Sequence, residues 1–292
     1  MREITLEELL EAGCHFGHQV TRQNPKAREY VFEARDNIHI IDLAKTKEGL
    51  DAAAAFVKDL ASKEGSSIII VATKRQARGI VEEEAKKVYS AITEEIPSFF
   101  YVTSRWIGGI LTNFPEVSKN YNKLKDLASK LKNNEEKAKY TKKEVGLWEK
   151  ERVKLENFYG GVKDMKKAPD ALFIIDTHLE DLAVREANRM GVPVVGIVDT
   201  NADPEVINYP IPANDDAVGS IKLIVSHIID AWIEGRKELE TKLKNPQLPE
   251  EEKVKEVKTK AKKEEKKVKG PVKKAPKVKS ESKTKEKSKS TK

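Results

Sequence analysis

Two histidines and a thiol lie within five residues near the start of the chain, as Cys14, His15 and His18. Imidazole nitrogen and thiolate sulfur are ligands that zinc and related transition metals prefer, so this spacing could begin a metal site. A His-x-x-His pair alone is a weak signal, however, because the chain has no second cysteine and no H-E-x-x-H motif. The alternative is that both histidines pack where the chain enters a sheet.

Carboxylates and a further histidine follow two apolar runs later in the chain. Asp176 and His178 come after "ALFII", and Asp199 comes after "VVGIV". In open α/β sheets, ligands collect at the carboxyl ends of the strands, where these residues could hold a divalent cation that activates water. The three residues are therefore the basis of one alternative function, a metal-dependent enzyme.

The competing interpretation is that Asp176 and Asp199 cap the helices or turns that follow their strands. Nothing in the sequence fixes a nucleophile, a general base and an open metal position together, so we expect no catalytic residue, no catalytic metal and no cofactor. A structural ion near His18 and Asp199 stays open. Neither a G-x-G-x-x-G loop nor a P-loop occurs in the chain, and we expect no small-molecule substrate.

Basic side chains form three clusters that contain or adjoin aromatic residues and glycines. The candidate RNA-binding residues are Arg22, Lys26, Arg28 and Arg35, interleaved with Tyr30 and Phe32; Lys74, Arg75 and Arg78; and Arg105 with Trp106. Guanidinium and ammonium groups pair with phosphates, and aromatic or guanidinium planes stack on unpaired bases. A single basic cluster is more often a solvated face than a site, but three clusters around one domain favour nucleic-acid binding.

The apolar runs that would position these side chains alternate with helical patterns. We expect strands at residues 37–41, 66–73, 98–103, 171–177 and 193–200, and helices near residues 45–63, 76–89, 179–190 and 215–235. Uninterrupted apolar runs are typical of parallel strands covered on both faces, and strands that alternate with helices indicate βαβ units. The sequence therefore predicts an α/β fold with a doubly wound parallel sheet of about five strands.

Residues 105–161 break this alternation. Apolar or small residues there recur in steps of four, three, four and three, which is a heptad seam on an otherwise charged helix: Val117, Tyr121, Leu124, Ala128 and Leu131. After the interruption "KNNEE", a second helix carries another stripe, made of Val145, Trp148, Leu155 and Tyr159. Because an isolated helix this polar is marginal, we expect an antiparallel coiled-coil hairpin that is inserted in the domain and projects from it.

Charge is divided unevenly along the chain. Residues 236–292 hold 22 basic and 10 acidic side chains, whereas residues 1–235 hold 33 basic and 38 acidic ones. We therefore expect an α/β nucleic-acid-binding domain at residues 1–235 and a disordered, lysine-rich tail at residues 236–292 that binds nucleic acid loosely. The alternative for the tail is a solubilising segment without a specific partner. The single cysteine, the acidic amphipathic start and the lack of about 18 consecutive apolar residues predict a cytoplasmic protein without a signal peptide or a membrane partner.

Nine stretches between Leu6 and about Gly235 match one known family in order: "LLEAGCHFGHQ", "NPK", "FEARDNIHIIDLAKT", "ATKRQA", "SRWIGGILTNF", "KLENFYGGVKDM", "PDALFIID", "EANRMGVPVVGIVDTNADP" and "IPANDDAVGSIKL". Together they resemble the small-subunit ribosomal protein S2 family in its bacterial form. The resemblance covers nearly all of the predicted domain, so it is far more specific than any single motif. The lysine-rich tail is longer and more basic than the resemblance predicts.

The resemblance implies a flavodoxin-like parallel sheet with a protruding helical hairpin and no catalytic activity. It implies a structural role in the small ribosomal subunit, in subunit assembly and in translation. The expected partners are small-subunit ribosomal RNA and neighbouring small-subunit proteins, including ribosomal protein S1, which the family helps to dock. On this footing the basic residues named above become candidate rRNA contacts, and His15 and His18 belong to an N-terminal signature with a structural role.

Overall fold

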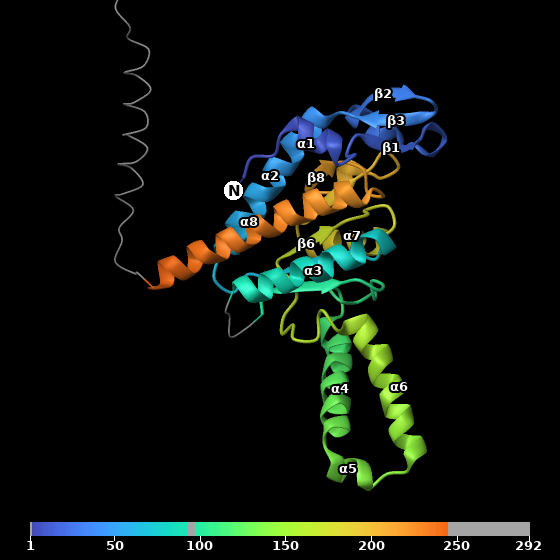
Figure 1. Ribbon diagram of the computed structural model, residues 1–292, viewed down its shortest axis with the longest axis vertical. Helices are drawn as coiled ribbons and strands as arrows, with labels where there is room; N and C mark the ends of the chain where they lie inside the picture. Colours follow the sequence, from blue (N-terminus) through green and yellow to red (C-terminus); the bar gives the residue numbers. More distant parts are fainter. Residues whose placement is uncertain (1, 93–96, 245–292) are drawn as a thin grey trace, which may run out of the picture. The chain divides into compact units, whose positions relative to one another are not determined.

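A five-stranded parallel sheet forms the centre of the chain, which a computed structural model describes for residues 2–92 and 97–244. Its order is β5-β4-β6-β7-β8, and its strands are β4 (Ile68–Val71), β5 (Phe99–Val102), β6 (Ala171–Ile174), β7 (Val194–Val198) and β8 (Tyr209–Pro212) (Figure 1). The helices around it are α1 (Leu6–Glu11), α2 (Leu43–Ala61), α3 (Arg75–Ala91), α7 (Asp181–Met190) and α8 (Val218–Lys244). The predicted α/β class with five parallel strands is confirmed.

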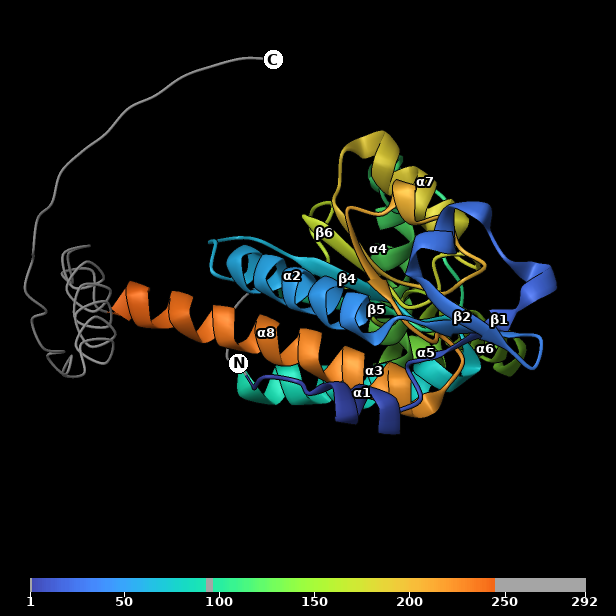
Figure 2. The ribbon, with the colours of Figure 1, turned by 90° about the horizontal axis from the view of Figure 1, so that it is seen from above.

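Two apolar clusters fill the spaces between the sheet and its helices. On one face, α2, α3 and α8 enclose a cluster that includes Leu50, Val81 and Trp232. On the other face, α7 and the segment with Trp106 and Ile110 cover a second cluster. Figure 2 shows α2, α3 and α8 on one side of the strands and α7 on the other. All residues of β4, β6 and β7 are buried as a result, which explains why these strands are uninterrupted apolar runs.

A smaller antiparallel sheet precedes α2 and differs from the prediction. It has the order β1-β3-β2 and consists of β1 (Phe16–Gln19), β2 (Val31–Arg35) and β3 (Ile38–Ile41), with the short 3-10 helices η1 (Val20–Arg22) and η2 (Pro25–Tyr30) between β1 and β2. The prediction that residues 37–41 form a strand of the parallel sheet is wrong. Asp36 and Asn37 have φ angles of 51° and 64°, so they form a tight turn that pairs β3 with β2 instead.

The fifth parallel strand is β8, which the sequence did not predict. Two of its four residues, Pro210 and Pro212, are prolines, which lack the N–H that a central strand would donate. The strand is tolerated because it lies at the edge of the described sheet, next to β7.

The predicted helical hairpin is present between β5 and β6. It consists of α4 (Phe114–Lys132), α5 (Asn134–Ala138) and α6 (Lys142–Tyr159), and α4 packs against α6. Val117, Tyr121 and Leu124 are buried in the seam, and the rings of Tyr121 and Tyr159 have centroids 5.4 Å apart. The rest of the predicted stripe on α6 is half-buried. Figure 1 shows the two helices close together near the sheet and further apart toward α5, so the seam is tightest at the root of the hairpin.

Specific contacts fix both ends of the hairpin at the sheet. Where the chain leaves the sheet, the carboxylate of Glu186 on α7 accepts hydrogen bonds from the backbone N–H groups of Gly109 (2.7 Å), Leu111 (3.3 Å) and Thr112 (3.4 Å). Where the chain returns, the carbonyl oxygen of Gly161 accepts a 3.2 Å hydrogen bond from the N–H of Tyr101 on β5. A side chain at Gly161 would collide with the backbone oxygen of Tyr101, so the two segments can approach this closely only with glycine there.

Helix α8 continues beyond residue 235, where the sequence placed its end. It runs to Lys244, and the buried guanidinium of Arg236 lies 4.9 Å from the centroid of the Trp232 ring and donates to the carbonyl oxygens of Lys63 and Ser66. The remainder of the predicted tail, residues 245–292, lies outside the described residues. Across residues 2–92 and 97–244, no helix combines the length and the apolar character that a membrane span requires.

Replacing Glu186 with alanine is expected to lower the free energy of unfolding by about 2–4 kcal/mol, because several partly buried N–H donors would lose a charged acceptor. Urea denaturation followed by far-UV circular dichroism measures this difference. The matched control is Glu83→Ala at an exposed position of α3, which should change stability by no more than about 0.5 kcal/mol. Equal stability of the two variants would contradict the anchoring role of Glu186.

Candidate functional site

Ionisable side chains meet at the carboxyl ends of four parallel strands. Between β4 and β6 the strand order reverses direction, which is where open α/β sheets bind their ligands. One more side chain reaches this place from β1 of the antiparallel sheet. We call the group the carboxyl-end cluster; its members are Lys74 after β4, Asp176 after β6, Asp199 after β7, Asp215 and Asp216 after β8, and His18 from β1.

Lys74 lies at the centre of the carboxyl-end cluster. Its Nζ is 2.8 Å from Asp176 Oδ2, 2.7 Å from Asp215 Oδ1 and 2.8 Å from Asp216 Oδ1. The side chain is 14% exposed, and burial alone would lower its pKa, but the three carboxylates outweigh this effect and raise the pKa above its ordinary value. Lys74 is therefore a charged link between the ends of β4, β6 and β8 and is not available as a general base.

His18 attaches the antiparallel sheet to the same cluster. Its Nδ1 lies 3.0 Å from Asp199 Oδ2, and its Nε2 lies 3.5 Å from Asp216 Oδ2. The hydrogen bond with Asp199 raises the pKa of His18, in opposition to burial, which lowers it. The backbone N–H of His18 also donates to Thr200 Oγ1 at 3.0 Å. These contacts hold β1 against the chain that leaves β7.

The aspartates that follow β6 and β7 also cap the backbone, which confirms the capping interpretation. Asp176 Oδ1 accepts a 2.8 Å hydrogen bond from the N–H of Leu179, and Asp199 Oδ1 accepts one of 2.5 Å from the N–H of Thr200. His178 is exposed and takes no part in the ligand group described next. The set of Asp176, His178 and Asp199 considered for catalysis therefore does not form one site.

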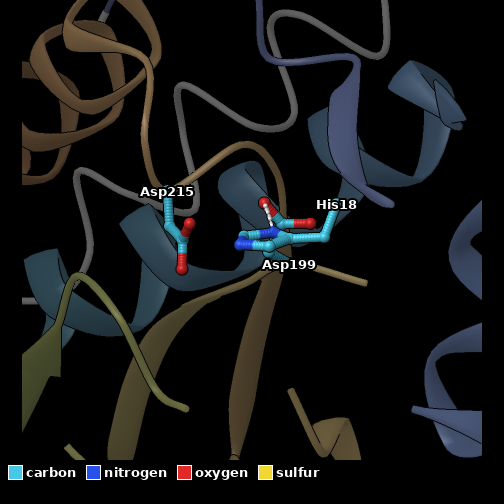
Figure 3. A group of neighbouring side chains, drawn as sticks. All are labelled: His18, Asp199 and Asp215. Atoms are coloured by element: carbon cyan, nitrogen blue, oxygen red, sulfur yellow. Dashed lines mark ion pairs between the residues drawn. The ribbon is translucent and has the colours of Figure 1, made fainter. Parts of the chain in front are cut away.

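Three members of the cluster could hold a divalent metal ion. Ligand atoms of His18, Asp199 and Asp215, one from each residue, all lie within 4.8 Å of one another, and Figure 3 shows the imidazole of His18 between the two carboxylates. One imidazole with two carboxylates is a ligand set that suits Zn²⁺ and related ions. Both aspartates are 1% exposed, so an ion placed among them would be largely removed from solvent.

The charge balance of the cluster also favours a bound cation. Four aspartates face one lysine and one histidine, and burial together with repulsion from Asp176 and Asp199 raises the pKa of Asp215 to about 8. Buried carboxylates that lie near each other destabilise a fold unless a proton or a cation neutralises them. A metal ion on His18, Asp199 and Asp215 would provide that charge and would join the two sheets without any catalytic step.

Most of the candidate RNA-binding side chains lie on the surface. The exposed ones are Arg22, Lys26, Arg28, Arg35, Arg75, Arg78 and Arg105. Lys26 is paired with Asp203 at 2.8 Å and with Glu205 at 2.6 Å, so part of its charge is already neutralised. Two residues differ from the expectation. Trp106 is 3% exposed and packs in the apolar cluster on the α7 side, where its ring cannot stack on a base, and Lys74 is surrounded by aspartates.

The exposed arginines form two groups. Arg22, Arg28 and Arg35 lie on η1, η2 and β2 in the antiparallel-sheet region. Arg78 donates to the carbonyl oxygens of Thr73 at 3.0 Å and Ser104 at 3.4 Å, which brings the first turn of α3 next to the segment that carries Arg105.

Asp215 and Asp216 are the members of the cluster that the sequence prediction missed. They follow β8 closely, and that strand was not recognised because of its two prolines. The signal that could have found them is "YPIPANDD", an apolar stretch that ends in consecutive carboxylates. Once β8 is placed beside β7, these carboxylates must lie at the same edge of the sheet as Asp199.

Comparisons with known proteins give a consistent result. The family model described as Ribosomal protein S2 matches residues 9–235. The Small ribosomal subunit protein uS2 of Coprothermobacter proteolyticus is 48% identical over 237 residues, which cover 81% of this chain and 84% of that protein. The protein of the same name in Dictyoglomus thermophilum is 46% identical over 255 residues, which cover 86% of this chain and 99% of that protein. The one in Geotalea uraniireducens is 48% identical over 235 residues, which cover 80% of this chain and 88% of that protein.

Titration of the metal-free protein with Zn²⁺ in a calorimeter is expected to show one bound ion for each chain and a raised melting temperature. Replacing His18 with glutamine should weaken binding by about tenfold or more, because one ligand contact worth about 1.5–3 kcal/mol is lost. The control is His178→Gln, which removes an exposed histidine outside the ligand group. An unchanged affinity in His18→Gln, or no binding by the unmodified chain, would contradict a metal site here.

Proposed function

The chain belongs to the ribosomal protein S2 family, and from this premise we propose that it binds small-subunit ribosomal RNA directly as part of the small ribosomal subunit. Membership of this family makes it a structural ribosomal protein and not an enzyme. The observation that carries the proposal is the extent of the match, since residues 9–235 include both sheets, the hairpin and the carboxyl-end cluster.

The proposed RNA-binding surface consists of the exposed arginines Arg22, Arg28, Arg35, Arg75, Arg78 and Arg105. Guanidinium groups bind phosphate oxygens in a bidentate geometry, which supports this role. Residues 1–235 hold more acidic than basic side chains, so their overall charge does not attract RNA. The contact would therefore be local, on the antiparallel-sheet region and at the adjoining ends of β4 and β5. Trp106 and Lys74 are left out because of their surroundings in the fold, and Lys26 is left out because it is ion-paired with Asp203 and Glu205.

We also propose contacts with neighbouring small-subunit proteins, including ribosomal protein S1, which the family resemblance implies. The antiparallel sheet supports a protein contact because it exposes several large apolar side chains, among them Phe16, Phe32 and Ile38. Grouped apolar side chains on a surface are typical of interaction sites.

The strand order supports a flavodoxin-like sheet. Numbered along the chain, the parallel strands lie in the order 2-1-3-4-5, which is the order of that fold. Sheets of this type bind cofactors at the point where the strand order reverses, between β4 and β6. Here the ion pair between Lys74 and Asp176 occupies that point, which argues against the alternative of a metal-dependent enzyme with an open catalytic site.

A tagged copy of the chain is expected to migrate with small subunits in a sucrose gradient of cell lysate, and to remain with them after EDTA separates whole ribosomes into subunits. Small subunits from cells depleted of the chain should also contain less ribosomal protein S1. If the tagged chain stayed at the top of the gradient, the proposed role in the subunit would be wrong.

Replacing Arg22, Arg28 and Arg35 together with glutamine is expected to weaken binding to small-subunit rRNA and to reduce the slope of log K against log salt by about 2–3, because each phosphate contact contributes about 0.7–0.9. Filter binding over a range of KCl concentrations measures both quantities. The control replaces three exposed lysines of α3 and α8, Lys86, Lys222 and Lys237, with glutamine, so that it removes the same charge. Equal losses in both variants would show that only net charge matters.

A further inference from the structure

The far end of the helical hairpin carries a basic surface that contains none of the candidate RNA-binding residues. Residues 130–143 contain six lysines and two acidic residues. The short helix α5 and the turn into α6 place these residues at the end of the hairpin opposite the sheet (Figure 1). We call this surface the hairpin tip; it consists of Lys130, Lys132, Lys137, Lys139, Lys142 and Lys143 with the aromatic residues Tyr140 and Trp148.

The lysines of the hairpin tip differ from those of the hairpin shaft in their partners. In the shaft, Lys119 lies 2.6 Å from Glu116, Lys125 lies 3.0 Å from Asp164, and Lys123 pairs with Glu151 across the two helices. Within the part of the chain that the structure describes, no lysine of the tip forms an ion pair. The nearby carboxylate of Glu144 is held in the capping box with Thr141 at the start of α6. Lys137 interacts electrostatically with Glu149, and the positive charge of the other tip lysines is not neutralised by an ion pair among the described residues.

Two aromatic side chains lie among these lysines. The ring centroids of Tyr140 and Trp148 are 4.5 Å apart, and Lys130 Nζ lies 5.7 Å from the centroid of the Trp148 ring. Tyr140 is 47% exposed, so its ring is accessible as well as packed. The contact with Trp148 fixes the turn between α5 and α6. It also holds the ring of Tyr140 in place among the lysines. Unpaired bases stack on such rings while lysines neutralise the adjoining phosphates.

The position of the tip separates it from the arginine surface. Helix α4 has 19 residues and so is about 28 Å long, at about 1.5 Å for each residue. The tip therefore reaches nucleotides that the sheets cannot touch. Residues 1–235 as a whole hold 38 acidic and 33 basic side chains, so the excess of lysine at the tip is a local feature. A local excess of unpaired lysines with an accessible aromatic ring fits RNA better than it fits an apolar protein surface.

We propose that the hairpin tip is a second, separate RNA-binding surface that takes unpaired nucleotides of small-subunit rRNA. The exposed lysines bind the phosphates, and the ring of Tyr140, held by Trp148, stacks on a base. This inference rests on the proposed function, because it assigns a further contact to the same partner.

The test uses the full-length chain with Lys132, Lys139, Lys142 and Lys143 replaced by glutamine, all of which are exposed. In filter binding to small-subunit rRNA, the variant is expected to lose about tenfold or more in affinity near physiological salt, and its salt slope should fall by about 3. Tyr140→Leu, which keeps an apolar side chain, should by itself lose about tenfold. The control replaces Lys86, Lys222, Lys237 and Lys242 and should change affinity much less. Circular dichroism establishes that every variant keeps its helix content.

Hydroxyl-radical footprinting separates this proposal from the proposed function. The tip variant should lose protection at nucleotides that differ from those lost in the variant of Arg22, Arg28 and Arg35. If the arginine variant binds weakly while the tip variant matches the unmodified chain, the tip is not an RNA site and the proposed function stands. Loss of protection at the same nucleotides in both variants would also contradict the proposal that the tip is a separate RNA-binding surface. If the tip variant keeps its RNA affinity but no longer enters small subunits, the tip contacts a protein instead. Absence of rRNA binding by the unmodified chain would overturn both proposals.

Discussion

Three carboxylates, from Asp176, Asp215 and Asp216, lie within 2.8 Å of a single ammonium group at one edge of the parallel sheet. Without Lys74 these carboxylates would repel one another, and the ends of β6 and β8 could not lie as close to β4 as they do. Removing one partner from a buried ion pair typically costs about 3–5 kcal/mol, which is a large share of the stability of a domain. The attachment of the antiparallel sheet depends on the same charges, because His18 reaches Asp199 and Asp216 beside them.

The carboxyl-end edge of the parallel sheet has a structural role here. The edge at which such sheets usually bind small ligands is here closed by the protein's own charges, so the reversal point between β4 and β6 joins parts of the protein. The surfaces proposed above for partners lie outside this edge, on the antiparallel sheet, at the start of α3 and at the hairpin tip. A large partner that binds several separate surfaces requires those surfaces to keep fixed relative positions. The carboxyl-end cluster holds the antiparallel sheet in place, and Glu186 holds the base of the hairpin.

The central fold could be predicted from the sequence because its signals are local. The cores of β4, β6 and β7 are uninterrupted apolar runs, and the seam of α4 repeats with a helical period. The errors concern features that depend on distant parts of the chain. Residues 37–41 have the composition of a core strand, but the turn at Asp36 and Asn37 pairs them with the preceding strand. Proline masked β8, which only its place at the sheet edge permits.

The site was predicted less completely, for the same reason. The caps of Asp176 and Asp199 follow from their positions after strands, and both are present. The surroundings of Lys74 could not be seen in "ATKRQA", because its partners come from segments 100 or more residues later in the chain. Similarly, an exposed arginine and a buried tryptophan are adjacent at residues 105 and 106, and local sequence does not show which of the two faces the solvent.

Both ends of the hairpin are fixed at the sheet, and this affects how the length of the hairpin can vary and how the chain can fold. The chain leaves the sheet near Gly109 and rejoins it at Gly161, and both points are fixed by contacts with the sheet domain. Helices α4 and α6 can therefore lengthen or shorten together by whole turns without moving β5 or β6. The length of the hairpin can thus change during evolution while the sheet stays the same. In folding, the hairpin can form from contacts between near neighbours in sequence, independently of the slower pairing of the parallel strands around it.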